Sequence, residues 1–131
     1  MMQDGLKLKK TILVVDDDAM FVSSLWQALM NEGYNVMAAR NSELAISLTK
    51  EKDPDLILLE ITISGFDGRQ TIKKIREISQ VPIIVITNER NEMVLTNTLN
   101  CGVDDLIRKP FKINILLGRI QAKLAKSSVN S

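Results

Sequence analysis

Residues 11–18 read TILVVDDD, and this stretch decides the fold class because five apolar or β-branched positions run directly into three acidic ones. An unbroken run of this kind is typical of a strand buried on both faces, which occurs in parallel sheets covered by helices. Asp16 and Asp17 leave the predicted strand at its carboxyl end. Asp18 is placed to cap the helix that follows.

The same alternation of strand and helix repeats along the rest of the chain. Further strands are predicted at residues 34–39, 56–59, 83–87 and 106–108, and helices at residues 21–29, 42–48, 72–78, 88–100 and 113–124. Either Asn41 or Ser42 can cap the second helix, and Gly33 and Gly102 end helices. Five alternating units require a parallel sheet with right-handed crossovers and helices on both faces. We therefore predict an α/β fold with a doubly wound, five-stranded parallel sheet in three αβα layers.

Length and charge limit the function classes. The chain has 131 residues, 45% of them hydrophobic, which suits one domain with a single core. Its net charge of +1 argues against nucleic-acid binding by the whole chain. Residues 106–131 carry only basic charges, which indicate a solvated face of the last helix or, alternatively, a patch for a partner or nucleic acid: Arg108, Lys109, Lys112, Arg119, Lys123 and Lys126.

Cysteine and histidine usage narrows the chemistry further. The chain has no histidine, which excludes Ser-His and Cys-His catalysis and imidazole metal sites. Cys101 is the single cysteine, so we expect a buried thiol and a reducing, cytoplasmic location. No apolar run approaches the roughly 20 residues that a membrane span needs, and residues 1–10 do not resemble a signal peptide.

Polar side chains gather where the predicted strands end. Asp16 and Asp17 follow the first strand, Glu60 the third, Thr87 ends the fourth, and Lys109 follows the fifth. Ligands of such sheets bind beyond the carboxyl ends of the strands. Neighbouring carboxylates repel unless a cation lies among them, and Mg²⁺ with oxygen ligands suits them. Lysine and a hydroxyl can bind an anionic oxygen, above all of phosphate.

Several blocks carry a resemblance to a known family. Residues 12–18, 54–59, 65–68, 82–87 and 102–105, followed by Lys109-Pro110-Phe111, resemble the receiver domain of two-component response regulators. The resemblance runs from about Thr11 to Ala125. We predict a domain at residues 11–126, between an N-terminal extension at 1–10 and a flexible tail at 127–131. It implies a flavodoxin-like sheet of order 2-1-3-4-5 and a role in phosphorelay signal transduction, as a signalling module rather than an enzyme.

The resemblance also implies roles for the strand-end residues. In the family a sensor histidine kinase transfers a phosphoryl group to an aspartate at the position of Glu60. The positions of Asp16 and Asp17 hold Mg²⁺ together with the acceptor and a backbone carbonyl, here that of Thr62. The positions of Thr87 and Lys109 bind phosphoryl oxygens, and the bond between the lysine and the following proline is usually cis.

Glu60 is the main departure from the family pattern. Its extra methylene moves the carboxylate by about 1.5 Å, and phosphoryl transfer depends on positioning. Glu60 can instead ligate Mg²⁺, or its longer side chain can reach Lys109 and partly imitate a phosphorylated aspartate. We therefore expect an atypical receiver that is phosphorylation-independent or phosphomimetic, whether Glu60 is natural or introduced.

Three further positions depart from the family pattern. Leu106 stands where the family usually has an aromatic residue, and Ser64 stands where proline is usual. The side chain of Asn88 can crowd the approach of a phosphoryl donor.

The family signals through its fourth helix, fifth strand and fifth helix. Asp105 and Arg119 resemble residues that cross-pair in receiver dimers, although a solvated surface explains them equally. Partners would be a histidine kinase or another signalling protein, and nucleic acid only through an output domain absent from this chain.

Two other classes remain as alternatives. An aspartyl-nucleophile phosphatase or phosphotransferase uses a similar sheet but usually carries a second acid two residues after the nucleophile, where this chain has Thr62. A flavin carrier would need a phosphate-binding loop after the first strand, where Asp16, Asp17 and Asp18 would repel a phosphate.

Overall fold

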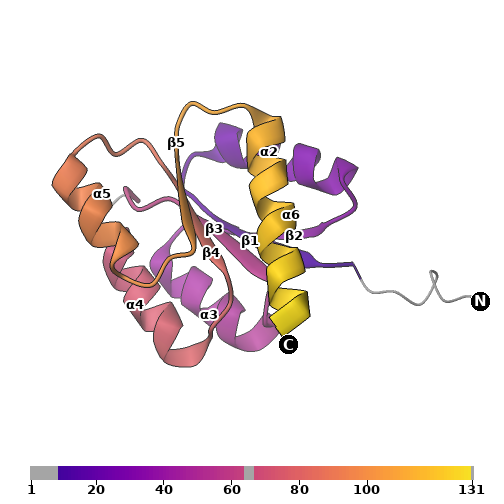
Figure 1. Cartoon of the computed structure of the whole chain (residues 1–131), viewed down its shortest axis with the longest axis horizontal. Helices are drawn as coiled ribbons and strands as arrows, with labels where there is room; N and C mark the ends of the chain where they lie inside the picture. The colour runs from indigo at the N-terminus through magenta and orange to yellow at the C-terminus, as the bar shows by residue number, and fades with distance from the viewer. Residues whose placement is uncertain (1–8, 64–66, 131) are drawn as a thin grey trace, which may run out of the picture.

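A computed structural model describes residues 9–63 and 67–130, and a five-stranded parallel sheet forms its centre (Figure 1). The strand order is β2-β1-β3-β4-β5, and each neighbouring pair is parallel. This order confirms the predicted doubly wound sheet. The strands are β1 (Thr11–Val15), β2 (Asn35–Ala39), β3 (Leu56–Leu59), β4 (Ile83–Thr87) and β5 (Asp105–Arg108).

Helices cover both faces of the sheet, as Figure 1 shows. Strand residues alternate in direction, so Leu13 and Val15 pack with α3, α4 and α5, whereas Ile12 and Val14 pack with α2 and α6. The three αβα layers are therefore present as predicted. The helices are α2 (Ala19–Asn31), α3 (Ser42–Lys52), α4 (Gly68–Ile78), α5 (Glu92–Leu99) and α6 (Ile113–Asn130).

The second strand begins one residue later than predicted, because the preceding residue belongs to a helix ending. Tyr34 donates its backbone N–H to the carbonyl of Leu29, and Gly33 donates to Met30. Gly33 has φ +93°, a left-handed conformation that suits glycine at the end of α2. This pair of bonds leaves Asn35 as the first residue of β2.

The helix predicted from Asn88 begins only at Glu92. The side chain of Asn91 accepts hydrogen bonds from the backbone N–H groups of Met93 and Val94, which is the geometry of an N-cap. Residues 88–91 consequently form a loop between β4 and α5. The structure also selects Asn41 as the cap of α3, and Asp18 caps α2 as predicted.

At the C-terminus the backbone of α6 continues to Asn130, across most of the segment that we predict to be a flexible tail. Residues 1–8 of the predicted extension at 1–10, the turn signal at Ser64 and Gly65, and Ser131 lie outside the described residues. Over the segments that the structure describes, no helix has the length and apolar character needed to cross a bilayer.

Candidate functional site

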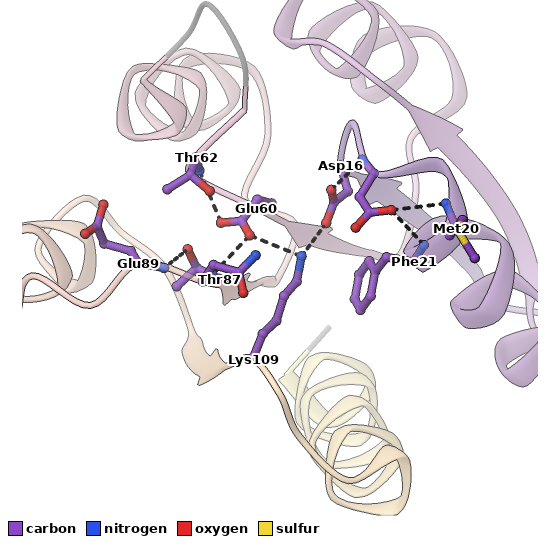
Figure 2. Close-up of polar contacts among 10 residues, drawn as sticks. Asp16, Met20, Phe21, Glu60, Thr62, Thr87, Glu89 and Lys109 are labelled. Carbon is purple, nitrogen blue, oxygen red and sulfur yellow. Dashed lines mark hydrogen bonds and ion pairs between the residues drawn. The ribbon is translucent and has the colours of Figure 1, made fainter.

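Four of the predicted site residues lie at the carboxyl edge of the sheet, and Figure 2 shows Asp16, Glu60 and Lys109 pointing toward one another. The hydroxyl of Thr87 is turned toward the backbone of Glu89. Asp16 follows β1, Glu60 follows β3, Thr87 ends β4 and Lys109 follows β5. All four are buried, with exposed fractions of 5%, 3%, 0% and 9% respectively. Three ionisable side chains are therefore held in an environment where charges need partners.

Lys109 lies between two carboxylates. Its Nζ is 2.8 Å from Oδ2 of Asp16 and 3.1 Å from Oε1 of Glu60 (Figure 2). The ammonium group also lies 4.0 Å from the centroid of the Phe21 ring, a cation–π distance. Asp16, Glu60 and Lys109 therefore lie in contact although they follow three different strands, and the longer side chain of Glu60 reaches Lys109.

The Glu60 carboxylate accepts two further hydrogen bonds from the backbone. Its Oε2 accepts from the N–H of Thr62 at 3.1 Å, and its Oε1 accepts from the N–H of Asn88 at 3.2 Å. Together with Lys109 these groups form a set of three donors that converge on an anion. The carboxylate of Glu60 occupies this set.

Asp16 and Asp17 have different surroundings. Asp16 accepts a hydrogen bond from the backbone N–H of Asp18 at 3.0 Å with the oxygen that does not bind Lys109. Asp17 is exposed, and both acids line a cavity of about 520 Å³ that also contains Trp26. The acids at this edge therefore divide into a buried one engaged by Lys109 and an exposed one facing the cavity.

Magnesium suits the kind of donors present, since carboxylate and carbonyl oxygens are its usual ligands. In the described part of the chain, however, no group of three or more acidic, cysteine or histidine side chains is arranged to hold a metal ion. Glu60 is turned toward Lys109 and two amides, so the ammonium group supplies the positive charge between Asp16 and Glu60. The assignment of Glu60 as a metal ligand stays a prediction.

Thr87 is fully buried behind this pair. Its Oγ1 accepts a hydrogen bond from the backbone N–H of Glu89 at 3.0 Å, and its carbonyl accepts from the N–H of Lys109 at 2.8 Å. Among the described residues no buried side-chain nitrogen or oxygen lacks a hydrogen-bond partner. The polar edge of the sheet is thus fully satisfied with Glu60 in place.

The structure also places the other residues that were compared with the family pattern. Leu106 is half-buried and packs against the core on the α3–α4–α5 side of the sheet. The side chain of Asn88 is exposed, while its N–H group contacts Glu60. Arg119 pairs with Asp105 of the same chain at 2.8 Å on the β5–α6 surface. The Lys109–Pro110 bond is cis, as the resemblance implies.

Sequence reasoning missed three contributors to the site. Phe21 begins the first predicted helix, and nothing in the sequence indicated that its ring lies against the Lys109 ammonium group. The amide of Asn88 escaped notice because backbone groups leave no trace in residue type. Arg90 donates to the carbonyl of Lys109 at 2.8 Å, and nothing in its polar loop indicated that partner.

The pKa of the Lys109 ammonium group leads to a prediction about how stability depends on pH. Burial alone would lower this pKa, but the hydrogen bond and charge of Asp16, followed by those of Glu60, outweigh burial and raise the pKa above its ordinary value. Because the folded pKa exceeds the unfolded one, the charged site contributes full stability below about pH 10.4 and loses it as the pH rises through the raised pKa. Urea unfolding of wild type and Lys109→Met should therefore show a stability difference that narrows in this alkaline range. A difference independent of pH would contradict the prediction.

Comparison with known proteins agrees with this architecture. Residues 12–121 match the response regulator receiver domain family. A two-component response regulator from Clostridium difficile is 34% identical, with a TM-score of 0.87, 91% of this chain covered and 98% of that one. A CheY-like receiver domain protein from Methanospirillum hungatei JF-1 is 27% identical, with a TM-score of 0.91, 95% of this chain covered and 100% of that one.

A third similar structure is the BeF3-activated N-terminal receiver domain of RstA from Klebsiella pneumoniae. It is 27% identical, with a TM-score of 0.83, and the match covers 88% of this chain and 98% of that one. Receiver domains of this family are typically signalling domains without enzymatic activity, and they generally bind Mg²⁺ at the phosphorylation site. With the family match spanning most of the chain and the strand-end residues gathered at one edge, this chain belongs to the response regulator receiver domain family.

Proposed function

We propose that this receiver domain signals without phosphorylation of residue 60 and that Glu60 holds it near one state. One observation carries the proposal: the Glu60 carboxylate accepts hydrogen bonds from the amides of Thr62 and Asn88 and pairs with Lys109. These donors would suit the oxygens of a phosphoryl group. An anion that belongs to the protein itself already engages them.

The imitation of a phosphorylated aspartate is partial. A carboxylate brings one negative charge and two oxygens, whereas a phosphoryl group brings nearly two charges and three oxygens. The buried Thr87 hydroxyl accepts a hydrogen bond from the backbone N–H of Glu89. The Glu60 carboxylate bonds instead to Thr62, Asn88 and Lys109, so a contact between the Thr87 hydroxyl and a phosphoryl oxygen is one that Glu60 does not reproduce. We infer a fixed, intermediate signalling state rather than full activation.

Magnesium binding belongs to the proposal in a weakened form. Asp16, Asp17 and the backbone carbonyl of Thr62 would hold the ion, which would neutralise the acids at this edge. Lys109 competes with it, because the ammonium group already lies between Asp16 and Glu60. We therefore expect weaker Mg²⁺ affinity than a receiver with aspartate at position 60 would have.

Partners of this domain would be a histidine kinase or another signalling protein in the cytoplasm, reached by protein–protein contact and not by catalysis. We keep the surface of α5, β5 and α6 as the proposed interface, including a homodimer in which Asp105 and Arg119 pair across the axis. These two residues are joined within the chain at 2.8 Å, so a dimer would have to exchange that pair. Exposed pairs of this kind cost little to exchange.

The decisive experiment compares wild type with Glu60→Asp, each given Mg²⁺ and beryllofluoride. We expect Glu60→Asp to bind the phosphoryl analogue about tenfold or more tightly, because the shorter side chain frees the donors and restores the acceptor geometry. Amide NMR signals of Thr62 and Asn88 report on the site directly. Fluorescence of Trp26, the only tryptophan, gives a second readout because it lines the same cavity as Asp16 and Asp17.

Glu60→Gln is the matched control, since it keeps the side-chain length and removes the charge. It should respond to beryllofluoride no better than wild type. An equally strong response from wild type and Glu60→Asp would show that Glu60 does not disable the site, and the proposal would then fail.

A further inference from the structure

The loop between β4 and α5 is fastened at each of its residues. The N–H of Asn88 bonds to Glu60, and the N–H of Glu89 bonds to Oγ1 of Thr87. The Glu89 carboxylate accepts from the N–H groups of Arg90 and Asn91 at 3.1 and 3.0 Å. The shape of this loop is therefore tied to the residues that form the site (Figure 2).

Arg90 extends from the same loop to the far side of the site. Its Nη2 donates a hydrogen bond of 2.8 Å to the backbone carbonyl of Lys109. That carbonyl lies beyond the last residue of β5, where the sheet offers no ladder partner. A charged donor makes a stronger bond than a neutral one, so the guanidinium group fixes the backbone from which the Lys109 side chain projects.

Glu60, Asn88, Arg90 and Lys109 form a closed circuit. The Glu60 carboxylate bonds to the N–H of Asn88 at the start of the loop and pairs with the ammonium group of Lys109. Arg90 joins the loop to the backbone carbonyl of Lys109. A displacement at Glu60 therefore acts on the loop at two residues, Asn88 and Arg90. Without Arg90 the loop would lose its connection to Glu60 through Lys109 and keep the direct bond from Asn88 to Glu60.

We propose that Arg90 is a positioning residue that couples the Glu60–Lys109 pair to helix α5. The coupling passes through Asn91, which caps α5 directly after Arg90. Helix α5 exposes Met93 at 76% and Leu99 at 52%, apolar groups that a signalling partner can contact. This inference deepens the proposed function and rests on it, because it names the route by which the state of residue 60 reaches the surface.

Arg108 provides a matched control. It pairs with Glu92 at 2.8 Å and so also joins the end of β5 to α5, but its side chain does not take part in the circuit. Both arginines are exposed, so we expect either substitution to leave the fold intact. An effect specific to Arg90 thus separates coupling through Lys109 from a general loss of charge or of contact with α5.

The experiment measures amide hydrogen exchange in α5 and the side-chain ammonium NMR signal of Lys109, in the absence of any phosphoryl analogue. In the wild-type background, Glu60→Gln should speed exchange in α5 by about tenfold, as expected for the loss of one charged hydrogen-bond acceptor. With Arg90→Ala already present, Glu60→Gln should add little. With Arg108→Ala present, Glu60→Gln should keep its full effect.

Arg90→Lys should restore part of the coupling, since an ammonium group can also donate to a carbonyl. The proposal is overturned when Glu60→Gln changes α5 equally with and without Arg90, or when Arg90→Ala leaves the Lys109 signal unchanged. The beryllofluoride titration tests the proposed function separately. A strong response of wild type there would refute phosphorylation independence, whereas additivity of residues 60 and 90 here would refute the coupling alone.

Discussion

Replacing Lys109 with methionine lowers the free energy of unfolding by about 3–5 kcal/mol at neutral pH, the usual cost of removing one partner from a buried ion pair. Asp16 and Glu60 would remain, with side chains only 4% and 3% exposed, and the cation between them would be gone. Two buried carboxylates would then repel each other without compensation. Urea unfolding monitored by circular dichroism measures the loss.

Lys112→Met is the control for this prediction, because Lys112 is exposed and three residues away in sequence. We expect it to change stability by less than about 0.5 kcal/mol. Adding Glu60→Gln to Lys109→Met should recover part of the loss, since one of the stranded charges disappears. Equal stabilities for Lys109→Met and Lys112→Met would show that the site does not depend on the ammonium group.

Gly68→Ala should also destabilise the domain strongly, by about 3 kcal/mol, as overpacking against backbone does when nothing can move aside. A Cβ atom at this position would overlap the Cα of Ile61, and the Gly68 N–H donates to the Ile61 carbonyl at 3.0 Å. Because Ile61 follows Glu60 directly, the required shift would disturb the site as well. Amide signals of Thr62 and Asn88 should therefore move together with the loss of stability.

Gly118 supplies the matched control. It lies within α6, and a Cβ atom there would meet nothing within 4 Å. Gly118→Ala should stabilise the domain by up to about 1 kcal/mol, because alanine favours the helix. If Gly68→Ala proved as stable as Gly118→Ala, the close approach of α4 to Ile61 would not constrain the site.

Much of the fold followed from residue patterns. Unbroken apolar runs at β1, β3 and β4 identified strands buried on both faces, and Asp18 was recognisable as a helix cap. The ends of helices were less predictable where contacts with other strands decide them. Helix α5 starts at Glu92 and not at Asn88, because the intervening loop is held by Glu60 and Thr87 from neighbouring strands.

By itself the sequence determined which residues leave the strands, because burial imposes a period that is visible along the chain. Only the tertiary structure decided which atoms meet. Lys109 contacts Asp16, which is 93 residues away in sequence. Which two carboxylates the ammonium group pairs with depends on the order and register of the strands. The hydrogen bonds of the Asn88 amide and of the Arg90 guanidinium group likewise depend on the tertiary structure. Hydrogen bonds require distances and directions that residue types do not encode.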